Sequence, residues 1–83
     1  MAVDEQLKRR INNLIKEQLY LPEDLELKPE DSLANDLGAD DLAEIETVMS
    51  LEEEFGITIS EKDEQELKTM QSIYDYIDRR MNS

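Results

Sequence analysis

The chain lacks cysteine and histidine altogether, and it has only two glycines, two prolines and one phenylalanine among 83 residues. Without cysteine it cannot form a disulfide, a thiolate metal site or a thiol nucleophile. Without histidine it lacks the commonest general base and the commonest transition-metal ligand of proteins. Catalysis would have to depend on carboxylate, lysine, tyrosine or serine side chains, so we expect a protein that is not an enzyme.

Basic residues are also scarce. The chain has nine of them and 22 acidic residues, so its net charge is −13. Residues 30–66 contain 14 acidic residues and a single basic one, Lys62. Such a balance disfavours nucleic acid and anionic membranes as partners and favours basic protein surfaces. For most of these carboxylates a solvated, soluble surface is the simpler interpretation.

Long apolar runs are absent too, and none approaches the length of a membrane span. The first residues, Met-Ala-Val-Asp-Glu, lack the basic and apolar regions of a secretory signal. A chain of this length allows one domain with a small core. We therefore expect a single domain over residues 1–83, cytoplasmic and monomeric.

Helical spacing of apolar residues predicts a first amphipathic helix over residues 4–19, with Asp4 as its N-cap. Its stripe comprises Val3, Leu7, Ile11, Leu14, Ile15 and Leu19. Pro22 and Pro29 then discourage a helix in residues 20–40. Leucines recur in that loop at Leu21, Leu25, Leu27, Leu33 and Leu37. We expect the loop to cross the bundle from one end to the other, with these leucines on the core.

The stretch of residues 36–56 organises the rest of the chain. Gly38 permits a tight turn, and Asp40 suits the N-cap of a helix. Asp41 follows in the first turn, where the helix dipole favours a negative side chain. Gly56 lies where a left-handed C-cap would end the helix. The apolar residues of this predicted helix are Leu42, Ile45, Val48, Met49, Leu51 and Phe55.

The sequence after Gly56 indicates one short helix and one longer helix. Residues 57–59 are better interpreted as a linker that buries two isoleucines than as a strand, because no second strand is available for pairing. Ser60 can cap a short helix over residues 61–66, and Thr69 can cap a last helix. No helix of this chain could bury its apolar stripe alone. The pattern therefore predicts an all-α fold: a small antiparallel bundle of three main helices plus one short helix, with a long first loop.

The central helix carries two stripes, because each residue advances about 100° around a helix. Ile45, Val48, Leu51 and Phe55 are predicted to face the core. The second stripe mixes apolar and acidic residues, namely Leu42, Glu46, Met49 and Glu53, and Glu44, Glu52 and Glu54 flank it. Apolar anchors among carboxylates suit docking on a basic protein surface. Spacing alone leaves open the alternative that these residues merely cover and solvate one end of the bundle.

One run of residues resembles the acyl carrier proteins of fatty-acid and polyketide synthesis. It begins with Leu37-Gly38-Ala39-Asp40-x-Leu42 and continues with Glu46, Val48, Met49, Leu51, Glu52, Glu53, Phe55 and Gly56. The resemblance extends from about residue 3 to residue 80 and implies the same helical bundle. In that family the residue between this aspartate and this leucine is the serine that carries 4′-phosphopantetheine. Here that residue is Asp41.

The resemblance implies docking on partner enzymes, but Asp41 departs from the family pattern at the position that carries the prosthetic group. The family presents this helix to its partner enzymes, so docking on their basic patches would use Leu42, Glu46, Met49, Glu52 and Glu53. The Asp41 carboxylate is no substrate for the usual phosphopantetheine transfer, so no cofactor is expected on this chain. Three explanations for Asp41 stay open: a natural paralogue without the arm, a deliberate replacement, or partial imitation of the phosphate by the carboxylate.

Three other hypotheses are weaker. Asp31-Ser32-Leu33 spells the attachment tripeptide of the family but lacks the preceding turn and the following acidic helix, so Ser32 is not the expected site. An acidic interaction module that imitates nucleic acid would need only charge, and not the run around Gly38. An EF-hand calcium loop is excluded, because placing either glycine at its sixth position puts Leu33 or Leu51 at the first.

Overall fold

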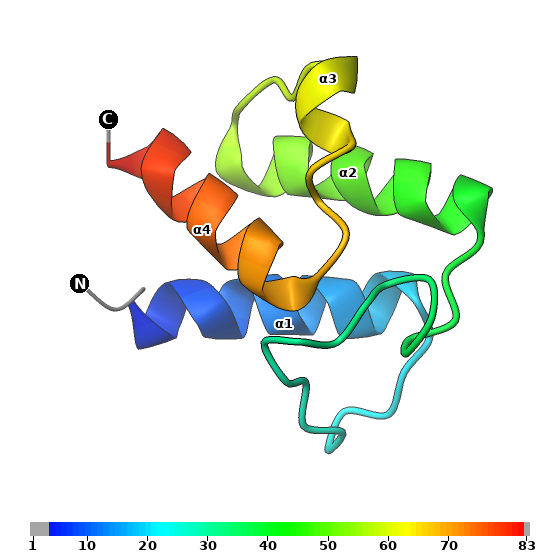
Figure 1. Cartoon of the computed structure of the whole chain (residues 1–83). Helices are drawn as coiled ribbons and strands as arrows, with labels where there is room; N and C mark the ends of the chain where they lie inside the picture. Colours follow the sequence, from blue (N-terminus) through cyan, green and yellow to red (C-terminus); the bar gives the residue numbers. More distant parts are fainter. Residues whose placement is uncertain (1–3, 83) are drawn as a thin grey trace.

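A computed structural model describes residues 4–82, which form four helices and no strand. They are α1 (Glu5–Gln18), α2 (Asp41–Phe55), α3 (Glu61–Glu64) and α4 (Met70–Met81). α1 and α2 lie side by side and antiparallel, and α4 crosses obliquely beside them (Figure 1). The predicted all-α bundle of three main helices and one short helix is confirmed. Val3, the first residue of the predicted α1 stripe, lies outside the described residues.

Each helix begins at the capping residue that the sequence predicts. The side chains of Asp4, Asp40, Ser60 and Thr69 each accept a hydrogen bond from a backbone N–H of the first turn. The C-cap of α2 is Gly56, whose φ of +65° is the left-handed conformation that glycine adopts without a Cβ penalty. α3 is shorter than predicted, since its helix ends at Glu64 and turns continue to Leu67.

The core lies where α1, α2 and α4 meet. These three helices supply six fully buried apolar side chains: Ile11, Ile15, Leu51, Met70, Ile73 and Ile77. Thr47 is also fully buried, and its hydroxyl donates to the carbonyl of Ala43 one turn earlier. The helix therefore satisfies this hydroxyl internally, which explains how a residue counted as polar in the pattern can face the core.

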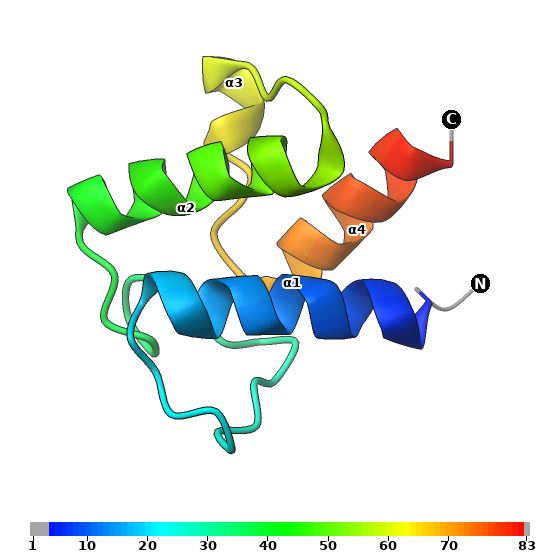
Figure 2. The same cartoon turned by 180° about the vertical axis from the view of Figure 1, so that it is seen from behind.

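The long first loop does not cross the bundle from end to end, as the sequence had suggested. It leaves α1 and reaches α2 at the same end of the bundle, because these two helices are antiparallel (Figure 2). Its middle reaches the start of α4, where Ser32 and Thr69 form an isolated antiparallel bridge. Leu27 and Leu33 are buried, and Leu21 and Leu37 are partly buried against the core, but Leu25 is 37% exposed.

Two isoleucine predictions need correction. Ile45 was expected in the core, but its side chain is 48% exposed. A groove of about 330 Å³ between α2 and the residues before α4 leaves it open, with Val48 and Leu67 among the other lining residues. In the linker after α2, Ile59 is buried but Ile57 only partly so.

α3 is attached to α4 by a polar network. The Tyr76 hydroxyl donates to Asp63 Oδ2 on α3 at 2.7 Å and accepts from Arg80 Nη1 at 2.7 Å. Arg80 also donates to the carbonyl of Thr58 in the linker that precedes α3. A four-residue helix has little intrinsic stability, so these contacts contribute to holding it in place. Among the described residues, no helix is long and apolar enough to cross a membrane.

Candidate functional site

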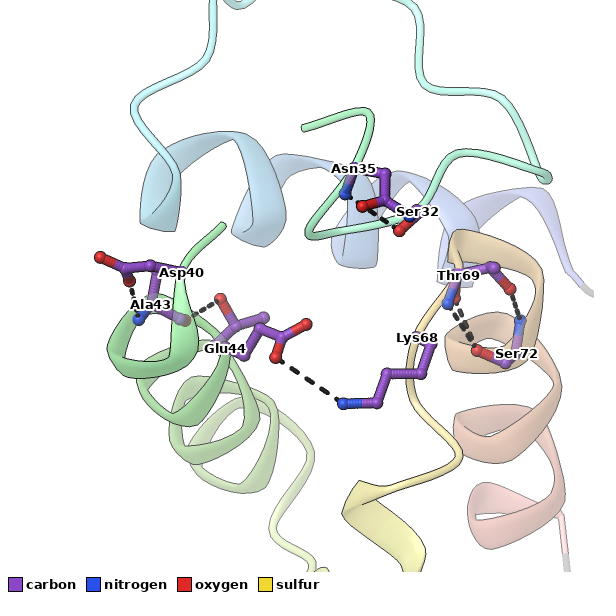
Figure 3. A network of polar contacts seen from close by, with 9 residues as sticks. Ser32, Asn35, Asp40, Ala43, Glu44, Lys68, Thr69 and Ser72 are labelled. Atoms are coloured by element: carbon purple, nitrogen blue, oxygen red, sulfur yellow. Dashed lines mark hydrogen bonds and ion pairs between the residues drawn. The ribbon is translucent and has the colours of Figure 1, made fainter. Parts of the chain in front are cut away.

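The position that the resemblance assigns to the prosthetic group is the first residue of α2. Asp40 is the N-cap, and its Oδ1 accepts a hydrogen bond from the Ala43 N–H at 2.8 Å (Figure 3). Asp41 follows it inside the first turn, as predicted, and its side chain is exposed. Within the described residues the Asp41 carboxylate has no hydrogen bond or ion pair, so it presents its charge to solvent at the positive end of the helix dipole.

Asp41 does not fit the prosthetic group of the family. A phosphodiester to 4′-phosphopantetheine requires a hydroxyl oxygen, whereas Asp41 offers a carboxylate. The nearest hydroxyl along α2 belongs to Thr47, which is fully buried and already bonded to the Ala43 carbonyl. The start of this helix therefore presents no accessible hydroxyl on which the arm could be attached.

Ser32, in the look-alike tripeptide, has a structural role instead. Its Oγ accepts a hydrogen bond from the Asn35 N–H, and its own N–H donates to Asp36 Oδ2 at 2.7 Å. These two contacts close a turn in the loop on the way to α2, as capping side chains do at helix starts. Figure 3 shows Ser32 in the loop, away from the first turn of α2.

The outward face of α2 brings together most of the predicted docking residues. Leu42 is 64% exposed and Met49 is 57% exposed, so both apolar side chains are available to a partner. Ile45 joins them, and the three residues form a row with helical spacings of three and four. Glu46 and Glu53 are also exposed, and within the described residues their carboxylates have no partner.

The fifth predicted docking residue differs from the others. Glu52 is only partly exposed, and its Oε2 accepts a hydrogen bond from the Ile59 N–H at 2.7 Å. This contact ties the linker after α2 back onto the helix. Glu44 is similarly engaged, because its Oε1 lies 3.7 Å from Lys68 Nζ in the segment before α4 (Figure 3).

A second groove, of about 460 Å³, lies between α1 and α2. Its lining residues are Arg10, Asn13, Leu14, Glu17, Gln18, Ser50, Glu53 and Glu54. Arg10 pairs with Glu54 at 3.0 Å, and its guanidinium lies 4.5 Å from the centre of the Phe55 ring. Sequence reasoning did not connect α1 with this surface, because the neighbours on α1 are more than 30 residues away along the chain.

Sequence reasoning also did not assign Lys68 or Ile45 to this surface, because it placed Ile45 in the core. No spacing rule relates Lys68 to Glu44, since they lie on different elements that only the folded chain brings together. Among the described residues there is no group of three or more acidic residues placed to hold a metal ion.

Comparison with known proteins identifies the family. Residues 9–77 match the family described as the phosphopantetheine attachment site. A protein of Mycobacterium tuberculosis, assigned as an acyl carrier protein, is 33% identical, with a TM-score of 0.76 over 83% of this chain and 90% of that one. Another such protein, from Anaplasma phagocytophilum, is 32% identical, with a TM-score of 0.86 over 100% of this chain and 96% of that one.

These matches cover most of the chain and agree with its fold. Proteins of this family carry 4′-phosphopantetheine that is attached after translation, and they act as carriers and not as catalysts. The chain therefore belongs to the acyl carrier protein family.

Proposed function

We propose that this protein docks on acyl-transfer enzymes as an acyl carrier protein does, but is not phosphopantetheinylated at residue 41. The observation that carries the proposal is the combination found on α2. Its outward face keeps exposed apolar anchors and unpaired carboxylates, while its first residue, Asp41, offers no hydroxyl. One helix thus has the features needed for recognition and lacks the atom needed for loading.

The docking part of the proposal follows from exposure and charge. Burying Leu42 and Met49 against a partner would remove apolar surface from water, which stabilises a complex. Exposed carboxylates such as Glu46 and Glu53 contribute mainly to the rate and orientation of encounter with a basic surface. Glu52 is the weakest member of the predicted set, because one of its oxygens already bonds the Ile59 N–H.

The non-carrying part follows from bond chemistry. Transfer of the arm to a serine forms a phosphodiester, whereas transfer to a carboxylate would form an acyl phosphate, which hydrolyses readily. The Asp41 side chain therefore cannot replace a serine oxygen in this role. We further propose that the protein acts as a single-domain monomer in the cytoplasm, within fatty-acid or polyketide synthesis.

The test of docking is binding to an enzyme that recognises acyl carrier proteins. A phosphopantetheinyl transferase of broad substrate range serves as the probe, with affinity measured by isothermal titration calorimetry. We expect Met49→Ala to weaken binding by about tenfold, corresponding to about 1.4 kcal/mol of lost apolar contact. Met81→Ala is the matched control, because Met81 is 46% exposed but lies at the end of α4.

Two results would contradict docking through α2. One is that the wild-type chain fails to bind the transferase at all. The other is that both methionine variants bind as well as the wild type, which would place the contact elsewhere. Circular dichroism of each variant separates a lost contact from a lost fold.

The alternative is an acidic module that imitates nucleic acid and has no link to acyl chemistry. It accounts for the charge of −13 but gives no role to the exposed Leu42, Ile45 and Met49. It predicts binding to basic nucleic-acid-binding proteins with a steep loss of affinity as salt rises. Binding of that kind, unaffected by Met49→Ala, would favour the alternative.

A further inference from the structure

The turn that ends α1 holds an exposed aromatic residue in an unfavourable backbone conformation. Tyr20 follows the C-cap of α1 and has a φ of +56°. Apart from the glycines, it is the one residue with a positive φ in the part of the chain that the structure describes. A residue with a Cβ is strained in this left-handed region. The Tyr20 side chain is 94% exposed, so packing within the protein does not compensate for that strain.

The end of α2 shows that the fold does not need a tyrosine in such a turn. Both helices end with a hydrogen bond from an N–H to the carbonyl five residues earlier, from Leu21 to Lys16 in α1 and from Ile57 to Glu52 in α2. The residue before the donor is left-handed in each case, and in α2 it is Gly56. Glycine is the usual residue at this position of the motif. The tyrosine at the end of α1 therefore has no evident advantage for folding.

The Tyr20 ring also differs from the other aromatic rings, which belong to two tyrosines and one phenylalanine. Each of those rings has a basic side chain over it: Lys8 over Tyr74, Arg10 over Phe55, and Arg79 and Arg80 over Tyr76. The negative face of an aromatic ring attracts such a cation. Within the described residues, no cation lies over the Tyr20 ring and its hydroxyl has no hydrogen bond.

Carboxylates without partners surround this position. In the chain, Tyr20 stands between residues that line a groove of about 430 Å³: Asn13, Lys16, Glu17, Leu21 and Glu23. Glu17 and Glu23 are exposed, and their carboxylates have no partner within residues 4–82. Lys16 is the cation of this set, and its Nζ already donates to the Glu23 carbonyl at 2.8 Å. The groove therefore keeps an excess of negative charge.

We propose that Tyr20 and this groove bind an arginine side chain of a protein partner. The guanidinium stacks on the exposed ring, and the carboxylates of Glu17 and Glu23 supply negative charge beside it. Arginine suits the site better than lysine does, because its planar group stacks on an aromatic face and is more weakly hydrated. The site includes no residue of α2, so it is independent of the docking proposed above.

The strained turn favours a binding role for the ring. Left-handed residues other than glycine persist where the surrounding structure enforces them, and they cluster at functional sites. Here the bond from the Leu21 N–H and the packing of Leu21 against the core fix the turn on both sides of the strain. An anchor whose backbone is already fixed loses little conformational freedom when a partner binds.

The test compares two blocked peptides, hexa-arginine and hexalysine, in separate titrations of the isotope-labelled full chain followed by NMR. The peptides carry the same charge, so the general attraction to a chain with a net charge of −13 affects both. We expect the signals of Tyr20 to saturate at an about two- to fivefold lower concentration of hexa-arginine, as for a cation–π contact at an exposed site.

Tyr20→Gly is the decisive variant, because it removes the ring and the strain together. We expect the preference for hexa-arginine to disappear at the neighbouring amides of Glu17 and Leu21. We also expect the urea midpoint of unfolding to rise, because the relief of strain exceeds the entropy that glycine costs. Tyr20→Phe is the matched control, since it keeps the ring and should keep the preference.

Three results would overturn the inference. The first is equal saturation of the Tyr20 signals by the two peptides, and the second is a preference for arginine that survives in Tyr20→Gly. The third is a lower urea midpoint for Tyr20→Gly, which would show that the tyrosine serves the fold. None of these measurements uses the transferase, so the docking proposed for α2 stands or fails separately.

Discussion

Two adjacent aspartates at the start of α2 have separate tasks. Asp40 holds the N-cap through its bond to the Ala43 N–H, whereas the neighbouring Asp41 carboxylate has no partner among the described residues. Asp41 stabilises the helix only because its negative charge lies at the positive end of the helix dipole, and repulsion from Asp40 offsets that gain. The fold therefore depends on the first aspartate, and the chemistry of the site depends on the second.

This division predicts unequal effects of replacing the two residues with alanine. Asp40→Ala leaves the Ala43 N–H without its acceptor and should lower the free energy of unfolding by about 1 kcal/mol. Asp41→Ala removes a dipole contact and a repulsion together, so its effect should be within about 0.5 kcal/mol. Urea denaturation followed by circular dichroism measures both. Equal losses would show that Asp41 also caps the helix.

The two aspartates could be placed from the sequence because N-caps are recognised from neighbouring residues alone. Contacts between distant elements could not be predicted in this way. An aspartate after a glycine turn, followed by a helical pattern, indicates an N-cap without any tertiary information. The partners of Glu44 and Glu52 could not be predicted in the same way. Lys68 is supplied by a different element, and the Ile59 N–H is supplied by the path of the linker.

At the scale of elements, α3 depends on its neighbours more than any other helix does. It has four residues, and the Tyr76 hydroxyl on α4 joins it to the bundle through Asp63. Burial raises the pKa of Tyr76 above 10, the hydrogen bond to Asp63 raises it further, and Arg80 opposes the shift. The folded state thus favours the protonated phenol.

Tyr76→Phe should therefore loosen α3 and lower the free energy of unfolding by about 1–2 kcal/mol, because its hydroxyl bonds two charged groups. In the wild type, the contribution of Tyr76 is fully present below pH 10 and is lost as the pH rises through the raised pKa of the folded state. Denaturant unfolding between pH 8 and pH 11 tests the sign.

Tyr20→Phe is the control for this prediction, because Tyr20 is 94% exposed and no hydrogen bond of its hydroxyl is seen. Hydrogen exchange should become faster in α3 in the Tyr76 variant and remain unchanged in the Tyr20 variant. Unchanged exchange in both would mean that apolar packing alone holds α3.

Ile45 shows why element-level prediction from spacing is incomplete. Periodicity identifies the direction of the buried stripe of α2, and Val48, Leu51 and Phe55 are buried as predicted. Periodicity does not tell how far neighbouring elements extend over the edges of that stripe. The groove beside the segment before α4 leaves Ile45 half exposed, and so adds an apolar side chain to the outward face.

At low salt the range of electrostatic interactions is about as long as the whole molecule. Its extents are 31 × 27 × 20 Å, and it carries a net charge of −13. The Debye length is about 30 Å at 0.01 M salt and about 10 Å at 0.1 M. At low salt nearly every carboxylate therefore interacts with every other one, and this repulsion opposes the compact state.

Salt should accordingly stabilise this fold. Raising sodium chloride from 0.01 M to 0.1 M should increase the midpoint temperature of unfolding, because the repulsion is screened more strongly in the compact state than in the unfolded chain. Differential scanning calorimetry measures the change, and Glu30→Lys should show a smaller one. A midpoint that falls with salt would mean that attractive pairs such as Arg10–Glu54 dominate.

At this scale most of the architecture could be predicted, because three helices with apolar stripes of these lengths have few ways to bury them. The path of the long loop was the exception. Its leucines indicated contact with the core but not that the loop returns to the end of the bundle from which it starts. That path is determined by backbone contacts such as the bridge between Ser32 and Thr69, which leave no trace in a hydrophobic pattern.

The most direct test of the central claim is the intact mass of the protein after incubation with a broad phosphopantetheinyl transferase and coenzyme A. We expect no mass gain for the wild-type chain, because Asp41 offers no hydroxyl, and a gain of one phosphopantetheine arm for Asp41→Ser. A gain on the wild-type chain would contradict the claim that it cannot be loaded. A folded Asp41→Ser variant that stays unmodified would contradict the claim that its docking surface is recognised.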